Sequence, residues 1–190
     1  MPVDLIAFTA DRRIHGAIPL ADDRLSDMLN SVARVVIRGA LIEDIAGETP
    51  PHTVDLTLAV GSIVAVLVAG RRGVENRRRK TEAGRTRIGL GRFVVTGSLH
   101  VPAGSAESLA SGDPARVLAG RDLLVPLTDA TITYDRDDGR TSEAFETILV
   151  NRAHATWIDV EDPGDDGDSD VAEEAPLADH ASYVKGFTGA

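Results

Sequence analysis

The chain carries one pattern of apolar and polar segments twice, and this internal repeat constrains the fold more than any other feature. Gly16, inside Ile-His-Gly-Ala-Ile, corresponds to Gly97, inside Val-Thr-Gly-Ser-Leu. Further along, Val60 closes an apolar run in the first copy as Val150 does in the second. The offset between the copies grows from 81 residues at Gly16/Gly97 to 90 at Val60/Val150, which a few loop insertions explain.

The repeated segments are typical of β-strands. Leu56, Leu58 and Val60 alternate with more polar or smaller residues, as in a half-buried strand. The pair Pro50-Pro51 cannot lie inside a sheet ladder, and Asp138-Gly139 favours a hairpin turn. We predict a mainly β fold of two tandem small β-barrel-like modules, SH3-like or Sm-like, each with one short helix; a split sandwich is the alternative. The predicted boundaries are a first β module at residues 1–70, a basic linker at 71–87, a second β module at 88–160 and a disordered acidic C-terminal tail at 161–190.

The element prediction follows the same pattern. We expect residues 54–60 and 63–69 to pair as a hairpin with Gly61-Ser62 at the bend or at a bulge. The full set is strands at 3–9, 13–20, 35–45, 54–60, 63–69, 91–102, 123–135 and 143–159, with a short helix at 24–31 and its counterpart near 105–109.

The net charge of −10 hides two opposed charge poles. Residues 71–92 hold nine Lys and Arg against two Glu, a local charge of +7, whereas residues 159–174 hold nine Asp and Glu and no base. A segment this acidic has too little apolar surface to bury, so it cannot offset the conformational entropy lost on ordering. We therefore predict that it is disordered. Tyr183, Val184 and Phe187 near the end favour a short docking peptide on this tether, with a frayed terminus as the alternative.

The basic linker is a candidate contact with another macromolecule. Its charged residues are Arg71, Arg72, Arg77, Arg78, Arg79 and Lys80, followed by Arg85 and Arg87. Arginine clusters bind phosphates through paired donors, but no aromatic residue interleaves with these to stack on bases. Pairing with the protein's own acidic tail, binding to nucleic acid or an anionic surface, and no specific role all stay open.

Catalytic and metal-binding signatures are missing from the sequence. The absence of cysteine excludes disulfides, thiolate nucleophiles and cysteine zinc sites. The histidines His15, His52, His100, His154 and His180 show no zinc-binding spacing, and no phosphate loop or nucleophile elbow is present. The acidic tail matches a calcium-loop template only in part, at Asp162, Asp166, Gly167, Asp170 and Glu173. We therefore predict no catalytic residue, no cofactor and no metal.

The sequence also bears on location and assembly. The most apolar segment, residues 54–69, contains Asp55 and is too short to span a bilayer comfortably, and residues 1–10 lack a secretory signal. These features favour a cytoplasmic protein without a membrane span. Exposed edge strands on two modules also make pairing into a dimer plausible.

Three short strings resemble a pattern found in uncharacterised bacterial small β-module proteins. They are Arg-Leu-Ser-Asp-Met-Leu-Asn at 24–30, Pro-Leu-Thr-Asp-Ala at 126–130 and Val-Asn-Arg-Ala-His at 150–154. The resemblance implies one compact module of a strand, a short helix and several more strands, here duplicated. It implies no activity.

The preferred hypothesis is a non-enzymatic adaptor or regulatory protein that acts through protein–protein interaction. One alternative is a nucleic-acid-associated protein that uses the basic linker. A second alternative is a small-ligand sensor or an enzyme with its site between the modules, formed by His15, Asp129, Asn151 and His154.

Overall fold

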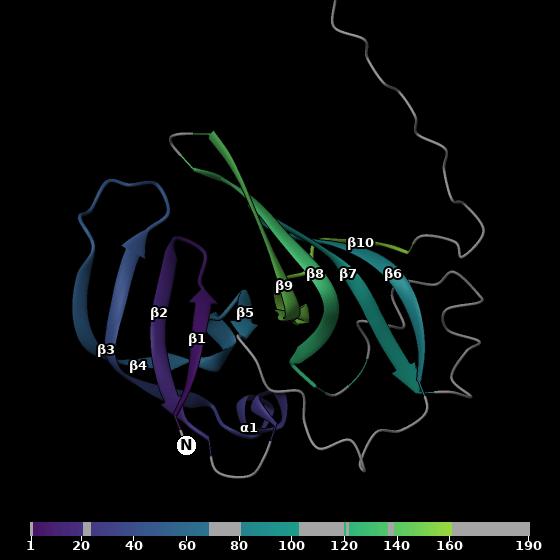
Figure 1. Cartoon of the computed structure of the whole chain (residues 1–190), viewed down its shortest axis with the longest axis horizontal. Helices are drawn as coiled ribbons and strands as arrows, with labels where there is room; N and C mark the ends of the chain where they lie inside the picture. Colours follow the sequence, from purple (N-terminus) through teal and green to yellow (C-terminus); the bar gives the residue numbers. More distant parts are fainter. Residues whose placement is uncertain are drawn as a thin grey trace, which may run out of the picture.

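The computed structural model describes residues 2–20, 24–68, 81–102, 120, 122–136 and 139–160. Its ten strands form one antiparallel sheet, which confirms the mainly β class, in the order β10-β6-β7-β8-β9-β5-β1-β2-β3-β4 (Figure 1). The elements are β1 (Pro2–Phe8), β2 (Arg12–Pro19), α1 (Leu25–Ser31), β3 (Arg34–Asp44), β4 (His52–Ala59), η1 (Val60–Ser62), β5 (Ala65–Val68), β6 (Thr81–Leu90), β7 (Phe93–Pro102), β8 (Leu124–Arg136), β9 (Gly139–Asn151), η3 (Arg152–His154) and β10 (Trp157–Val160).

The two halves of the sheet repeat the same strand order. The first half runs β5-β1-β2-β3-β4 and the second runs β10-β6-β7-β8-β9, so the fifth strand returns beside the first in each. The same backbone hydrogen bonds recur as well. The amide of Val64 donates to the Phe8 carbonyl at 2.7 Å, and that of Thr156 donates to the Gly89 carbonyl at 2.8 Å. The two halves therefore share one pattern of strand pairing.

Each half bends its sheet with a glycine at the same place. The pairing register shifts beside Gly16 between β2 and β3, and beside Gly97 between β7 and β8. A Cβ on Gly97 would lie 2.7 Å from the Cβ of Ala130, closer than side chains pack. The facing strands have a left-handed residue there, Gly39 at φ 57° and Asp129 at φ 48°. The repeated glycines thus allow two strands to approach closely at a bulge.

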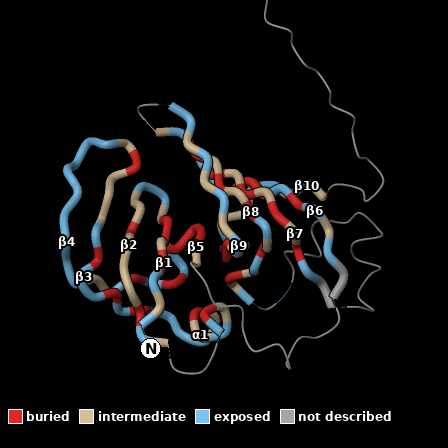
Figure 2. The backbone as a smooth tube through the Cα atoms, in the orientation of Figure 1, coloured by how far each residue is buried: buried red, intermediate tan, exposed pale blue. Residues whose placement is uncertain are grey.

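The halves are joined by direct pairing of β5 with β9, which lie side by side in Figure 1. Ala65, Val66 and Leu67 pair with Val150, Leu149 and Ile148, and all six residues are buried (Figure 2). Side chains cross this seam in both directions. Phe8 and Leu67 pack into the core of the second half, while Leu124 and Leu149 pack into the core of the first.

The short helix fastens the first half to the second. Leu25 and Leu29 bury their side chains in the first core. Asn30 then forms two hydrogen bonds with the backbone of Leu124 at the start of β8. Its side-chain amide donates to the Leu124 carbonyl at 3.0 Å and its oxygen accepts from the Leu124 amide at 2.8 Å.

Two predicted elements differ from the structure at the end of each half. Strands β4 and β5 do not form a hairpin, because the turn η1 redirects the chain and β5 pairs with β1 and β9 instead. The predicted strand 143–159 is likewise two strands separated by η3. In both halves the turn directs the chain from the fourth strand to a fifth strand that pairs with the first, β5 with β1 and β10 with β6.

The basic linker was predicted too long. Strand β6 begins at Thr81, so residues 81–87 belong to the sheet. Arg85 and Arg87 are exposed, whereas Thr86 and Ile88 are buried. This alternation is typical of a β-strand with one face in the core, even though the segment is basic. The predicted second helix near 105–109 and the tail 161–190 lie outside the described residues.

The glycine at the bulge gives a stability test. We expect Gly97→Ala to lower the free energy of unfolding by about 1–3 kcal/mol, because the added methyl overpacks against Ala130. Gly61→Ala is the matched control: a Cβ there meets nothing within 4 Å, so the change should stay within about 0.5 kcal/mol. Urea unfolding measures both, and equal stabilities of the two variants would contradict the close approach.

Candidate functional site: the junction cluster and the Trp157 surface

The interaction residues predicted from the sequence lie outside the part of the chain that the structure describes, and so does the calcium-loop segment. This holds for Arg71, Arg72, Arg77, Arg78, Arg79, Lys80, Tyr183, Val184 and Phe187. Their roles stay predictions. The described residues contain two other groups with chemical character.

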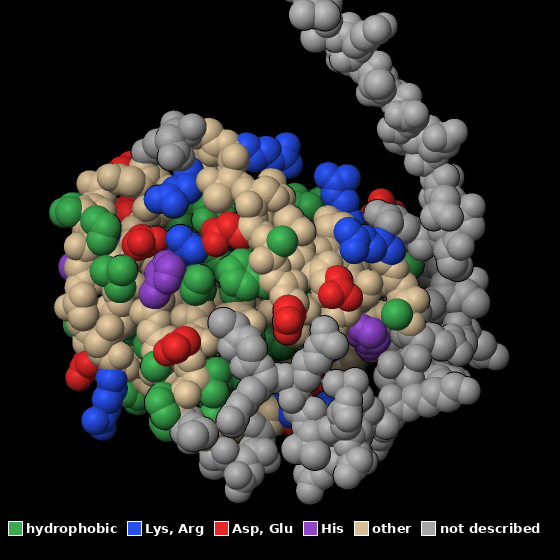
Figure 3. All heavy atoms as spheres, in the orientation of Figure 1, with side chains coloured by type: hydrophobic (Ala, Val, Ile, Leu, Met, Phe, Trp, Pro, Cys, Tyr) green, Lys and Arg blue, Asp and Glu red, His purple; other side chains and the backbone are tan. Residues whose placement is uncertain are grey.

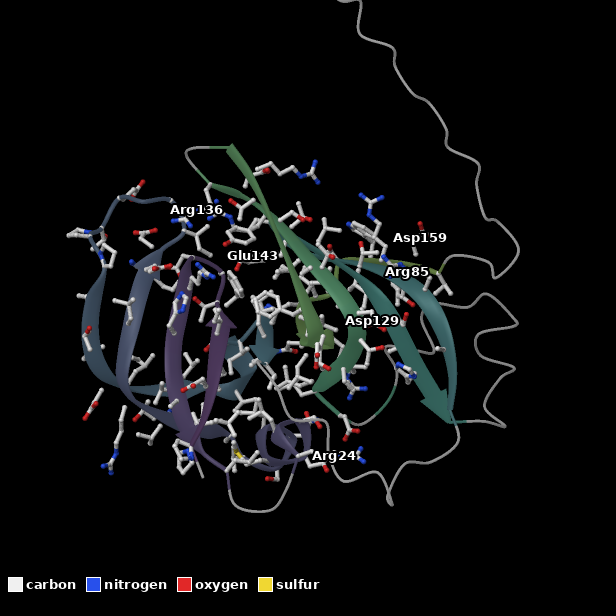
Figure 4. The ribbon with its side chains drawn as sticks, viewed as in Figure 1. Arg24, Arg85, Asp129, Arg136, Glu143 and Asp159 are labelled. Carbon is white, nitrogen blue, oxygen red and sulfur yellow. The ribbon has the colours of Figure 1, made fainter. Side chains whose placement is uncertain are left out.

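The first group is a junction cluster of Arg13, His15, Glu43, Tyr134 and Glu143, where the two halves meet. Arg13 Nη2 donates to Glu143 Oε2 at 2.7 Å, and Arg13 Nη1 lies 3.5 Å from Glu43 Oε2. Tyr134 Oη donates to the other oxygen of Glu143 at 2.7 Å. Glu143 is labelled in Figure 4, on the part of β9 that faces the first half. The cluster therefore ties β2 and β3 to β8 and β9 through charged groups.

The junction cluster rests on three packed aromatic rings. Phe8 meets Phe93 and Tyr134 edge-on, with ring centroids 5.4 and 5.2 Å away, and the Arg13 guanidinium lies 5.9 Å from the Phe8 centroid. Burial, and after it the hydrogen bond to the Glu143 carboxylate, together raise the pKa of Tyr134 from 10 to about 12. The tyrosine hydroxyl therefore stays protonated and keeps donating at neutral pH.

A hollow of 530 Å³ lies beside the junction cluster. Its lining combines apolar side chains of both halves, such as Ile6, Leu67 and Phe145, with His15 and Arg38. The Nε2 atom of His15 is buried without a hydrogen-bond partner and lies 3.5 Å from Glu43. Of the four residues predicted for a site between the modules, only His15 lines this hollow.

The other three of those residues have different surroundings. Asn151 is buried and its side-chain amide donates to the Ile63 carbonyl at 2.6 Å, which fixes η3 against η1. His154 lies 2.9 Å from the Gly61 carbonyl through its Nε2 atom. Asp129 is exposed at the bulge of β8 (Figure 4). The structure does not assemble the four into one site.

The second group is the Trp157 surface, formed by Arg85, Arg87, Gly89, Trp157 and Asp159 on β6 and β10. Trp157 is 44% exposed although it is the only tryptophan in the chain. Its indole lies over Gly89, where any Cβ would collide with the ring. The Arg87 guanidinium lies 5.8 Å from the ring centroid, within cation–π range. Arg85 and Asp159 are labelled on the same side of the molecule in Figure 4.

Sequence reasoning missed the Trp157 surface because its parts are far apart in the chain. Trp157 stands 70 residues after Arg87, and only the pairing of Trp157 with Gly89 and of Asp159 with Arg87 brings them together. The basic region lacks aromatic residues in sequence, but the fold supplies one in space. The available signal was a lone tryptophan in a polar strand.

Exposed apolar side chains gather at both ends of the sheet. Among the described residues, Val36, Leu41 and Val54 are exposed on β3 and β4, and Trp157 is exposed on β10. Figure 3 shows hydrophobic side chains over β3 and β4 and Lys and Arg side chains over the side with β6 and β10. Since β4 and β10 are the two terminal strands, these surfaces lie at opposite ends of the strand order.

The described residues bear on metal binding and on membrane spanning. Within them, no group of three or more His, Asp or Glu side chains is arranged to hold a metal ion. No helix in that part of the chain is long and apolar enough to cross a bilayer.

Comparison with known proteins adds no relative. The chain matches no family model, no curated protein and no solved structure.

The Tyr134–Glu143 hydrogen bond gives a titration test in a Tyr183→Phe background, where Tyr134 is the only tyrosine. Glu143→Gln should lower the pKa of Tyr134 from about 12, but not below its ordinary value of 10, because burial still disfavours the anion. Glu146→Gln, on an exposed part of β9, is the control and should leave the titration unchanged. Absorbance of tyrosinate against pH measures the shift.

The same raised pKa predicts how stability depends on alkaline pH. The neutral hydroxyl is favoured in the folded state, so its contribution is complete below pH 10 and is lost as pH rises from 10 to about 12. Unfolding of the Tyr183→Phe protein should become easier across that window, and less so in Glu143→Gln. A pKa of Tyr134 that is the same with and without Glu143 would contradict the account.

Proposed function

We propose that the protein is a non-enzymatic adaptor that binds protein partners at the two ends of its sheet. The observation that carries this proposal is the placement of exposed apolar side chains. Val36 and Leu41, on the exposed face of β3, mark one end and Trp157 marks the other. Two separate recognition surfaces on one rigid frame are what an adaptor needs in order to hold two partners at once.

The frame of this adaptor is a pair of tandem, small barrel-like modules. Three observations support this part of the proposal: the shared strand order, the recurring backbone bonds and the glycine bulges at Gly16 and Gly97. Each half also has a core of its own, with contributions from its neighbour. Small β modules of this kind commonly serve recognition, an inference by analogy of fold.

The Trp157 surface fits an extended protein strand as its partner. Strand β10 is the last in the strand order, so its outer edge offers backbone groups for an added strand. Beside that edge Trp157 provides a rigid aromatic anchor, and Arg85 and Arg87 favour an acidic partner.

Paired variants test the two-ended adaptor. In affinity capture from the native cell, Trp157→Ala should remove one set of partners, and Val36→Ser with Leu41→Ser, on the exposed face of β3, should remove another. Loss of an anchor residue costs about 2 kcal/mol or more, roughly thirtyfold in affinity. Val32→Ser, exposed but outside both surfaces, should keep both sets. Loss of the same proteins from both variants, or no loss from either, would contradict the proposal.

Single-stranded nucleic acid is a second candidate ligand for the Trp157 surface. Trp157 stacked beside Arg87 supplies the aromatic platform next to basic charge that such binding uses. The two candidates predict different salt dependence. Nucleic-acid affinity should fall steeply with salt and lose about 1–3 kcal/mol in Trp157→Ala, whereas protein partners should survive nuclease treatment.

A further inference from the structure

We propose that the acidic segment 161–174 of the same chain binds the Trp157 surface. The pairing of β10 with β6, and not only the opposite charge, directs this segment toward the surface. Because β10 runs antiparallel to β6 and Val160 pairs with Thr86, the chain leaves β10 toward the part of β6 that precedes Thr86. That part contains Arg85 and is preceded in sequence by the basic residues 77–80.

The register makes the first contact specific. Trp157 and Asp159 lie on the exposed face of β10, opposite Gly89 and Arg87 on β6. One more pair in the same register would set Glu161 opposite Arg85. Opposite charges directly across two antiparallel strands stabilise the pair. The acidic segment therefore starts beside the charge it would neutralise.

Charge complementarity extends along the segment. Residues 161–174 hold eight Asp and Glu and no Lys or Arg. Within the described residues, neither Arg85 nor Arg87 forms an ion pair with an acidic side chain. The tether is short, since Asp162 follows Val160 by two residues, and a short tether raises the local concentration of the occupant.

A second copy of the chain fits the Trp157 surface less well. If the β5–β9 seam were repeated between chains, β10 of one copy would meet β4 of the next. The residues needed for that seam are replaced at both ends. Gly89 in the second half is equivalent to Phe8 in the first, since the carbonyl of each accepts the hydrogen bond from the residue just before the fifth strand. The pair Phe93–Tyr134 has as its counterpart Arg12–Asp44, an ion pair at 3.1 Å.

Fluorescence of the single tryptophan gives a direct readout that needs no added partner. Acrylamide, a neutral quencher, reports how accessible Trp157 is without responding to charge. If the acidic segment covers the surface, quenching of the full chain at low salt should be weaker than that of a chain ending at Val160. Raising NaCl to 1 M, where the screening length is about 3 Å, should bring the full chain up to the shorter chain's value.

Substitutions separate this contact from general effects of charge. Replacing the eight acidic residues of 161–174 by Asn or Gln, or Arg85 by Gln, should raise quenching to the value of the chain ending at Val160. Arg34→Gln, on the exposed start of β3, is the matched control and should leave quenching unchanged. Arg87 is left intact because it contacts the indole itself.

Equal quenching of the full chain, the chain ending at Val160 and the Arg85→Gln variant at low salt would overturn the proposal. The inference concerns the same surface as the proposed function, but the readout needs no partner. Its failure would leave the adaptor proposal in place, whereas loss of no partner in Trp157→Ala would count against the adaptor proposal alone.

Discussion

The pairing of β5 with β9 is the interaction on which the rest of the structure depends. Each half contributes five strands, and small β modules of this size bury little surface alone. The seam solves this by completing each core with side chains from the other half, including Phe8 and Leu149. Asn30 and the junction cluster then lock the same seam through hydrogen bonds and charge.

The seam also explains why the two ends of the sheet differ from its middle. Where the halves meet, aromatic and aliphatic side chains are covered by the neighbouring half. At the free ends the corresponding positions are polar or small, as at Asp44 and Gly89. Polar edges discourage repeated pairing between copies. Trp157 on β10 departs from this pattern, as do Val36, Leu41 and Val54 at the other end, because these apolar side chains are exposed.

Much of the fold could be predicted from the sequence because its signals are local. The repeat, the alternation in β4 and the turn at Gly139 indicate strands without any knowledge of contacts. The hairpin between β4 and β5 was wrong because strand periodicity says nothing about which strands pair. The turns η1 and η3 decide that, and they depend on the buried amide of Asn151 and on backbone bonds such as Val64 to Phe8.

The candidate sites were harder to predict, for a related reason. The charges of the basic region are visible as composition, but its aromatic neighbour Trp157 comes from the last strand of the sheet. In the junction cluster, Arg13 and Glu143 are 130 residues apart and look like ordinary surface charges in the sequence. Of the residues predicted for a site between the modules, His15 lines the hollow beside the junction cluster, whereas Asn151 and His154 hold η3 against η1.

The central claim is that the two halves form one sheet through β5 and β9. Amide hydrogen exchange at Asn151 tests it most directly, because this amide donates across the seam to the Val64 carbonyl at 2.9 Å. The account predicts that the Asn151 amide exchanges as slowly as the slowest amides of the core strands, since it opens only when the protein unfolds. Exchange orders of magnitude faster, with both cores still protected, would show that the halves part independently and would contradict the account.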